Sequence, residues 1–293
     1  MSDDSKARGH VERGMELIDE GRYEAAIAEC DEAIGMEPEN SDFRTVRGEA
    51  FSRMEKFAEA ASDFDKAIAM DPGNYAAYMG RGMLRRKMGL LDESVEDFGK
   101  GIGICPDIPV AYVYRGEAYK EMGDFESAIA DFSAAIRIDK DDLMANLMRG
   151  YTYMEQGEIG KAMKDIDRAI SIDPDCAQAY SIRASTYIEM DEFDKALGDL
   201  DRAIALDPED FNSFVLRSEV FIAMGTHEKA VADLDEAVRL APAFAIGFIL
   251  IARGLACAGM GRKEEAAADL AKALELDPDL DEVAQALEEA IGE

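Results

Sequence analysis

The stretch RGEAYKEMGDFESAIADF, from Arg115 to Phe132, decides the fold because a close copy, RGEAFSRMEKFAEAASDF, occupies Arg47 to Phe64. The two copies share Arg-Gly-Glu-Ala at the start and Asp-Phe at the end, and they lie 68 residues apart. A recurrence at fixed spacing indicates a repeat protein, in which each unit packs on its neighbours.

Proline marks half of that spacing along the chain. The prolines at 38, 72, 106, 174, 208, 242 and 278 are 34 residues apart, except for a gap of 68 that Lys140 divides and a last gap of 36. A helical pattern ends before each of them, as expected before proline. We therefore predict eight copies of one unit, at residues 7–40, 41–74, 75–108, 109–142, 143–176, 177–210, 211–244 and 247–280, with a two-residue offset at 245–246. Residues 1–6 form a polar tail and residues 281–293 a closing helix.

Numbering each copy from place 1, with Ser41 as place 1 of the second copy, shows what recurs. Places 8, 20 and 27 hold small residues, place 24 is bulky and apolar, and place 15 is glycine in six copies. Small residues allow two helices to approach closely, and glycine commonly ends a helix. Each copy is predicted to be a helical hairpin that turns at place 15.

This pattern of small, aromatic and proline places resembles the tetratricopeptide repeat, and the resemblance covers residues 7 to 278. It implies an all-α fold, an α-solenoid of antiparallel helix pairs in a right-handed superhelix whose concave wall is made by the first helix of each pair, closed by a C-terminal capping helix. The sequence departs from the family pattern in having no tryptophan at place 4 and in having Lys140 in a proline slot.

Two charged places recur in every copy. Place 7 is always arginine and place 23 always acidic, and both lie eight residues from the turn, so they should face each other about 12 Å down their helices. We predict a partly buried ion pair within each copy, or between one copy and the next, in preference to a ladder of arginines that binds an anionic ligand. The first copy would pair Arg13 with Glu29, and the other pairs are Arg47 with Asp63, Arg81 with Asp97, Arg115 with Asp131, Arg149 with Asp165, Arg183 with Asp199, Arg217 with Asp233 and Arg253 with Asp269.

The composition narrows the functions to consider. The net charge of −31 repels phosphate backbones and anionic lipid, so we expect neither nucleic acid nor membrane as a partner, but a basic or amphipathic protein segment. The start, MSDDSKARGH, has no apolar signal segment, and the four cysteines are widely spaced, which favours a cytoplasmic protein with reduced thiols. Only His10 and His227 offer imidazole, and no catalytic, metal or phosphate motif is present, so no enzyme activity, cofactor or metal is expected.

One face of the first helices is apolar where a purely solvated face would be polar. Places 2, 5, 9 and 12 lie opposite the core side, and in copies three to five most of them are apolar or aromatic. Such a stripe is typical of a peptide-binding surface, although places 2 and 5 could instead pack on the neighbouring copy. The predicted groove comprises Met79, Met83, Val110, Val113, Glu117, Met144, Leu147, Tyr151 and Met154.

These observations favour a non-catalytic scaffold that binds a partner segment in its concave groove. The Lys and Asn clamp, by which the best-known members of the family bind chaperone tails, is absent from the matching places. The eighth first helix is apolar nearly all round, which raises the alternative of a structural protein, a homo-oligomer that associates through Phe248, Ile251 and Leu255. An accessory subunit of an enzyme encoded elsewhere is not separated from the scaffold by sequence.

Overall fold

The computed structural model describes the chain from residue 3 to residue 277, together with residue 292, and the described part is helical without strands. The first helices of the pairs are α1 (Asp3–Asp19), α3 (Ser41–Arg53), α5 (Tyr75–Lys87), α7 (Pro109–Glu121), α9 (Leu143–Glu155), α11 (Ala177–Glu189), α13 (Phe211–Ala223) and α15 (Ile246–Gly259). The second helices are α2 (Tyr23–Met36), α4 (Phe57–Met70), α6 (Leu91–Ile104), α8 (Phe125–Ile138), α10 (Ile159–Ile172), α12 (Phe193–Leu206), α14 (His227–Leu240) and α16 (Lys263–Leu276). The closing helix expected at 281–293 lies outside the described residues, apart from residue 292.

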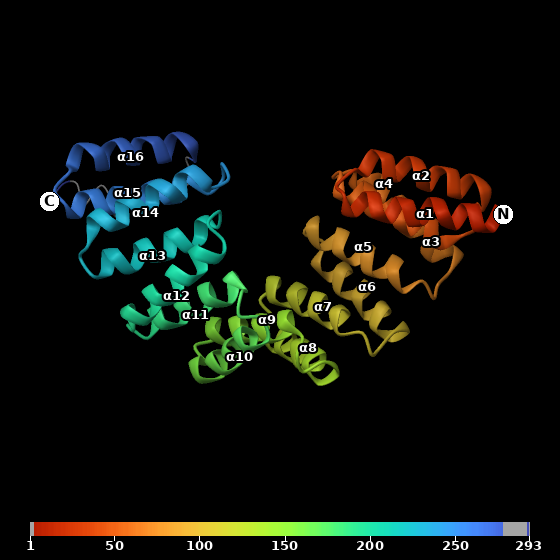
Figure 1. Ribbon diagram of the computed structural model, residues 1–293, viewed down its shortest axis with the longest axis horizontal. Coiled ribbons are helices and arrows are strands. Elements are labelled where there is room, and N and C mark those ends of the chain that lie inside the picture. Colours follow the sequence, from red (N-terminus) through yellow and green to blue (C-terminus); the bar gives the residue numbers. More distant parts are fainter. Residues whose placement is uncertain (1–2, 278–291, 293) are drawn as a thin grey trace. The chain divides into compact units, whose positions relative to one another are not determined.

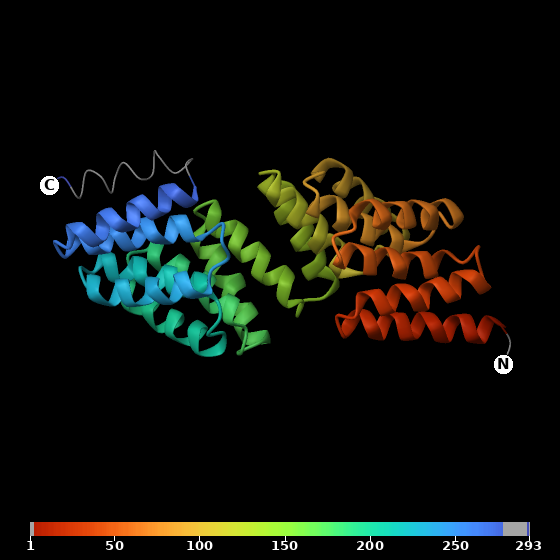
Figure 2. The ribbon, with the colours of Figure 1, turned by 90° about the horizontal axis from the view of Figure 1, so that it is seen from above.

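The chain forms two compact units, residues 1–152 and residues 153–293, with the boundary inside α9. In each unit a first helix packs along its own second helix, and that second helix packs on the next first helix. Figure 1 shows this order for the N-terminal pairs, where α1 lies beside α2, and Figure 2 shows the same helices from above. The predicted all-α repeat architecture is confirmed, with sixteen helices in the described part.

The turn at place 15 has the left-handed backbone conformation that its glycines indicate. The six glycines at this place have φ between +70° and +78°, in the left-handed region that glycine adopts without steric cost. In the two remaining copies, Glu55 (φ 60°) and Asp191 (φ 56°) adopt the same conformation. The hairpin geometry is therefore common to all copies, and two of them accept a strained residue at the turn.

Small residues at place 8 allow the two helices of a pair to pack closely around a buried aromatic ring at place 24. Phe64, Phe98 and Phe132 at place 24 are at most 1% exposed, and their rings lie against the glycines at place 8 of the same copies. A Cβ added at Gly82 would lie 2.7 Å from the Phe98 ring, and one at Gly116 would lie 2.7 Å from the Phe132 ring. Glycine at place 8 is thus required by the close approach of the aromatic ring in these copies.

Unit 1 curves toward its first helices. Helix α1 contacts α3, α3 contacts α5, and α5 contacts α7, whereas successive second helices in the described part of this unit show no contact of that extent. Helices that are closer together on one side of a stack bend the stack toward that side. The side chains at places 2 and 9 of α1, α3, α5, α7 and α9 therefore lie on the inner side of unit 1, which we call the first-helix face.

Candidate functional site

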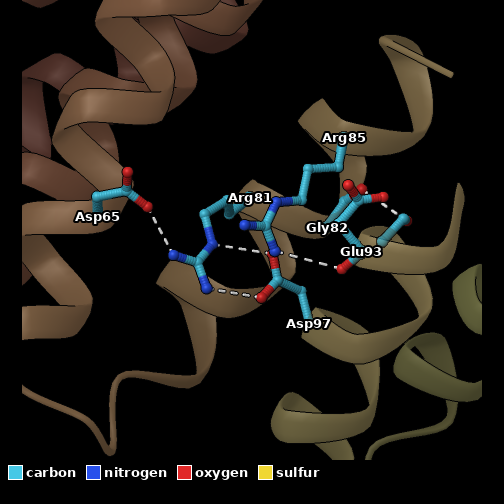
Figure 3. A network of polar contacts seen from close by, with 7 residues as sticks. Asp65, Arg81, Gly82, Arg85, Glu93 and Asp97 are labelled. Carbon is cyan, nitrogen blue, oxygen red and sulfur yellow. Dashed lines mark hydrogen bonds and ion pairs between the residues drawn. The ribbon is translucent and has the colours of Figure 1, made fainter. Parts of the chain in front are cut away.

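The arginine at place 7 and the acid at place 23 form a two-bond ion pair in most copies. Figure 3 shows one example, in which Arg81 donates from Nε and Nη2 to the two carboxylate oxygens of Asp97, at 2.9 and 2.7 Å. The Asp97 side chain is 2% exposed, and Arg85 donates a third hydrogen bond to it at 2.6 Å. The same paired geometry, with distances of 2.5 to 2.9 Å, joins Arg47 to Asp63, Arg115 to Asp131, Arg183 to Asp199, Arg217 to Asp233 and Arg253 to Asp269.

The same arginines also reach back to the preceding copy, which the sequence reasoning missed. The third guanidinium nitrogen of Arg81 donates to Asp65 of the preceding copy at 2.6 Å (Figure 3). Asp65 lies at place 25, and the aspartates at that place make the equivalent bond in four further pairs: Asp31 with Arg47, Asp167 with Arg183, Asp201 with Arg217 and Asp235 with Arg253. Where place 25 is not acidic the bond changes, since Arg149 donates to Ser133 and Arg115 lies near Gly99. Aspartate at place 25 in the copy before each such arginine is the sequence signal for this contact.

One expected pair does not form. Arg13 donates to Glu16 at 2.7 Å and lies 3.7 Å from Glu20, and its side chain is 44% exposed. Glu29 instead accepts a contact of 2.6 Å from Nδ1 of His10. The prediction is wrong in the first copy, where His10 engages Glu29 and Glu16 of the same helix engages Arg13. The Arg149–Asp165 pair stays a prediction.

The arginine network fixes the register of helices and leaves little charge for a ligand. The hydrogen bonds to Asp63, opposed by desolvation and supported by Asp31, raise the pKa of Arg47 above its ordinary value. The guanidinium of Arg47 uses Nε, Nη1 and Nη2 in these bonds, and its side chain is 19% exposed. Such a guanidinium is bound to protein carboxylates on two sides, which favours a structural role over anion binding.

The exposed side chains of the expected groove lie at places 2 and 9. Met83, Val110 and Met144 are 42%, 39% and 41% exposed, and Met15 of α1, at place 9, is 52% exposed. Glu117 and Tyr151, also at place 9, are half-buried. Large apolar side chains at these places therefore lie on the first-helix face of unit 1.

The apolar residues at places 5 and 12 are less exposed than the sequence predicts. Met79 (7% exposed), Val113 (3%) and Leu147 (0%) are buried at place 5, and Met154 at place 12 is 8% exposed. Met79 packs in a cluster with Phe98 of its own copy and Ala111 of the next first helix. The expectation that these four residues are exposed is wrong, because a first helix in a stack also buries the side that faces its neighbour, although Met79 still lines a hollow beside Met83 and Val110.

The polar residues of the first-helix face are paired across adjacent helices. Arg86 of α5 forms an ion pair with Glu117 of α7 and lies 3.5 Å from Glu121. The ammonium of Lys120 lies 4.1 Å from the ring centroid of Tyr151. Glu117 is therefore neutralised by an arginine, and the exposed apolar side chains lie beside pairs of opposite charge instead of a continuous acidic rim.

Two hollows open on this face. One, of about 490 Å³, lies between α1 and α3, and we call it the α3 hollow. The other, of about 280 Å³, lies over α5, and we call it the α5 hollow. Thr45 and Ala76 line both of them, so the two hollows are adjacent. The α5 hollow is reached past Met83 and Val110, two of the exposed residues of the first-helix face.

A second apolar patch lies at the eighth copy, in unit 2. Phe248 (54% exposed) and Leu255 (36%) of α15 are exposed, and so is Phe244 (80%) in the turn before that helix. Ile251 is 3% exposed and packs with Leu250, Cys257 and Leu270, so its prediction as an association residue is wrong. Phe244 was missed, although its place directly before the two-residue offset marked it as irregular.

The described residues hold neither a metal cluster nor a membrane-spanning helix. Among them no group of three or more His, Cys, Asp or Glu side chains could hold a metal ion. None of the described helices combines the length and apolar character needed to cross a bilayer. His10 belongs to unit 1 and His227 to unit 2, and the Nδ1 of His227 is buried without a hydrogen-bond partner among the described residues.

Family comparisons agree with the repeat geometry. Models described as tetratricopeptide repeat match residues 7–40, 45–107, 119–186, 183–243 and 247–280. The chain belongs to the tetratricopeptide repeat family. Tetratricopeptide repeats form protein–protein interaction scaffolds and are generally non-catalytic. No curated protein sequence matches the chain.

Solved structures of tetratricopeptide repeat proteins share the fold. A tetratricopeptide repeat protein from Parabacteroides merdae has a TM-score of 0.69 at 20% identity, over 86% of this chain and 99% of that one. A chain of the Cut9–Hcn1 hetero-tetramer of the APC/C has a TM-score of 0.71 at 13% identity, over 92% of this chain and 52% of that one. YrrB, described as a tetratricopeptide repeat protein with an unusual peptide-binding site, has a TM-score of 0.50 at 21% identity, over 63% of this chain and 95% of that one. At these identities the likeness shows the fold.

Proposed function

We propose that this protein is a non-catalytic scaffold that binds a segment of a partner protein along the first-helix face of unit 1. The observation that carries the proposal is the row of exposed Met83, Val110 and Met144 on α5, α7 and α9. Exposed apolar side chains that recur on one face of neighbouring helices are costly in water and are typical of interaction surfaces. Methionine is flexible and polarisable, so such a surface adapts to different apolar side chains.

The charge of the chain favours a basic or amphipathic partner. Acidic residues exceed basic ones by 31, and a negative potential speeds the approach of a basic segment and opposes nucleic acid and anionic lipid. YrrB is described as having a peptide-binding site, and peptide binding is the role proposed here for the first-helix face.

Affinity capture with a double variant tests the proposal. Met83→Glu with Met144→Glu places two carboxylates on the exposed row without touching the buried residues of the face. The matched control is Met190→Glu with Met224→Glu, since these methionines are 41% and 44% exposed at the ends of α11 and α13. We expect partners captured in stoichiometric amount by the wild type and the control to be lost from the first variant. Capture that is equal for all three proteins would exclude the first-helix face as the binding surface.

The exposed aromatic patch of the eighth copy supports a second candidate function, self-association. Phe244 and Phe248 are 80% and 54% exposed, which is unusual for phenylalanine in a monomer. We propose that a homo-oligomer would form through Phe244, Phe248 and Leu255. Light scattering over a hundredfold range of concentration tests this candidate, with Phe248→Ser as the variant. A constant monomer mass for the wild type at the highest concentration would eliminate it.

A further inference from the structure

The α5 hollow is lined by Gly80, which stands at place 6 of the third copy. In most copies this place holds a large apolar residue, such as Tyr114, Met148, Ile182 or Leu216. The Tyr114 ring lies over Phe98, the place 24 residue of the preceding copy, with ring centroids 5.9 Å apart. The equivalent of that pair in the preceding copies is Gly80 with Phe64. Glycine supplies no side chain to cover the ring.

Gly80 and Phe64 approach closely beside the hollow, because the Phe64 ring takes the room that a side chain at Gly80 would need. A Cβ built on Gly80 would lie 2.5 Å from the Phe64 ring, so the α5 backbone itself touches the ring. Phe64 is 1% exposed and is the least exposed of the residues that line the α5 hollow, which places it at the bottom. Met83 and Val110 lie at its exposed edge.

The size of the hollow fits one side chain. Its volume of about 280 Å³ lies just below the ~300 Å³ at which pockets begin to enclose drug-sized ligands. Its walls are mainly apolar, with Met79, Tyr75 and Tyr114 besides the edge residues. Apolar hollows with aromatic walls favour a large apolar or aromatic anchor residue from a partner.

The charges around the two hollows indicate which kind of residue would lie next to such an anchor in the partner segment. In the α5 hollow Glu49 and Arg53 lie 3.5 Å apart and offset one another. In the adjacent α3 hollow the charged residues are Glu12, Asp42 and Arg8, which sum to one negative charge. An occupant that runs from one hollow into the other therefore meets a net negative site in a chain of charge −31.

We infer that the α5 hollow is an anchor site for a phenylalanine or leucine of a partner segment whose neighbouring lysine or arginine lies in the α3 hollow. This inference rests on the proposed function and assigns it a position and a sequence preference. Met83, Val110 and Tyr114 of the α5 hollow contact the anchor, and Glu12 and Asp42 of the α3 hollow contact the basic residue.

Fluorescence anisotropy with synthetic peptides tests the inference on the full-length protein. The probes are fluorescein-labelled ten-residue peptides of Gly and Ser that carry one Phe and one Lys at separations of two to six residues. Matched peptides carry Ala for Phe, or Glu for Lys. We expect at least one Phe/Lys peptide to bind, its Ala version to bind at least tenfold more weakly, and its Glu version to bind more weakly still. Equal binding of the Phe and Ala peptides, or no measurable binding by any peptide, overturns the inference.

Two protein variants locate the site. Ala76→Arg blocks the junction of the hollows from an exposed position of α5, and Gln178→Arg makes a similar change at the same place of the sixth copy. We expect Ala76→Arg to weaken Phe/Lys binding at least tenfold and Gln178→Arg to leave it unchanged. Glu12→Lys, also exposed, should weaken the Phe/Lys peptide and strengthen the Phe/Glu peptide, which keeps the test decisive should Ala76→Arg fold poorly.

The two proposals fail in different ways. Partner capture that is sensitive to Met83→Glu with Met144→Glu, but unaffected by Ala76→Arg, would leave the scaffold function standing and reject the anchor site. Partner capture that neither variant weakens would reject both proposals.

Discussion

Arg81 joins three helices by holding Asp97 of its own copy with two hydrogen bonds and Asp65 of the preceding copy with one. The two carboxylates differ in environment, since the Asp97 side chain is 2% exposed and the Asp65 side chain is 60% exposed. Removing one member of a buried pair leaves an uncompensated charge, whereas an exposed ion pair contributes about 0 to 1 kcal/mol.

Asp97→Ala and Asp65→Ala are therefore expected to differ in stability. Urea denaturation should show a loss of about 3 to 5 kcal/mol for Asp97→Ala, because Arg81 and Arg85 both lose a buried partner. The loss for Asp65→Ala should stay below about 1 kcal/mol. Equal losses would mean that burial does not govern the network.

The first copy provides an independent check of the same network. Arg13 is bonded only to residues of its own helix in the described contacts and is 44% exposed, whereas Arg81 is 17% exposed. Arg13→Ala should cost less than about 1 kcal/mol in a urea titration, and Arg81→Ala about 3 to 5 kcal/mol. A large loss for Arg13→Ala would show that the exposed contacts of α1 matter more than its structure indicates.

Glycine at place 8 and phenylalanine at place 24 are expected to be coupled. A Cβ at Gly116 would lie 2.7 Å from the Phe132 ring, so Gly116→Ala should destabilise the protein by about 1 to 3 kcal/mol in spite of its better helix propensity. In a Phe132→Leu background the same change should be neutral or stabilising, as the Ala184 and Leu200 of the sixth copy indicate. The measurement is a double-mutant cycle in urea, with an expected coupling of about 1 to 3 kcal/mol.

A glycine in open space is the control that shows whether crowding against the Phe132 ring causes the loss of stability in Gly116→Ala. Gly198 lies inside α12 with no atom within 4 Å of an added Cβ, so Gly198→Ala should stabilise the protein by up to about 1 kcal/mol. Additive effects of Gly116→Ala and Phe132→Leu would contradict the proposed ring contact.

The repeat and its helix pairs could be predicted because they depend on residues that recur in every copy. Small residues at places 8, 20 and 27 and the positive-φ turn at place 15 act within one hairpin, so a single copy contains the information. The opposition of Arg81 and Asp97 follows from the same hairpin, since both are eight residues from the turn. Features that involve two copies were harder to predict.

The misses concern neighbours in space. Met79 lies opposite the core side of α5 on a helical wheel but is buried, because α5 also contacts the next first helix, α7. The bond from Arg81 to Asp65 joins two copies. It can be recognised in the sequence only when place 25 of one copy is compared with place 7 of the next copy. The α5 hollow is lined by residues of three successive copies, among them Phe64, Gly80 and Val110, so no single copy contains the information for it.

Salt should stabilise the protein. The excess of 31 acidic residues opposes the compact state through repulsion, and raising NaCl from about 0.01 M to about 0.5 M shortens the screening length from about 30 Å to below about 8 Å. We expect the urea midpoint to rise with salt, and equally in NaCl and KCl, because the buried Arg–Asp pairs are screened much less than the exposed acids. A midpoint that falls with salt would show that attractive ion pairs outweigh the repulsion.

Burial of Cys30 should make stability depend on pH in the alkaline range. Cys30 is 0% exposed, and this burial raises the pKa of its thiol from 9.0 to about 12. The folded state therefore keeps the proton while the unfolded state releases it, so the stabilising contribution is fully present below about pH 9 and is lost as the pH rises toward 12. Between pH 9.5 and 10.5 the free energy of unfolding should fall up to about 1.4 kcal/mol per pH unit more steeply for the wild type than for Cys30→Ala.

The comparison uses slopes, because Cys30→Ala also removes packing against Gly14 and lowers stability at every pH. Native labelling with a thiol reagent at pH 8 gives a second readout. The half-buried Cys105 and Cys176 should react, whereas Cys30 should react only on unfolding. Parallel pH profiles for the wild type and Cys30→Ala, together with fast labelling of Cys30, would show that α2 and α3 do not shield this thiol from water.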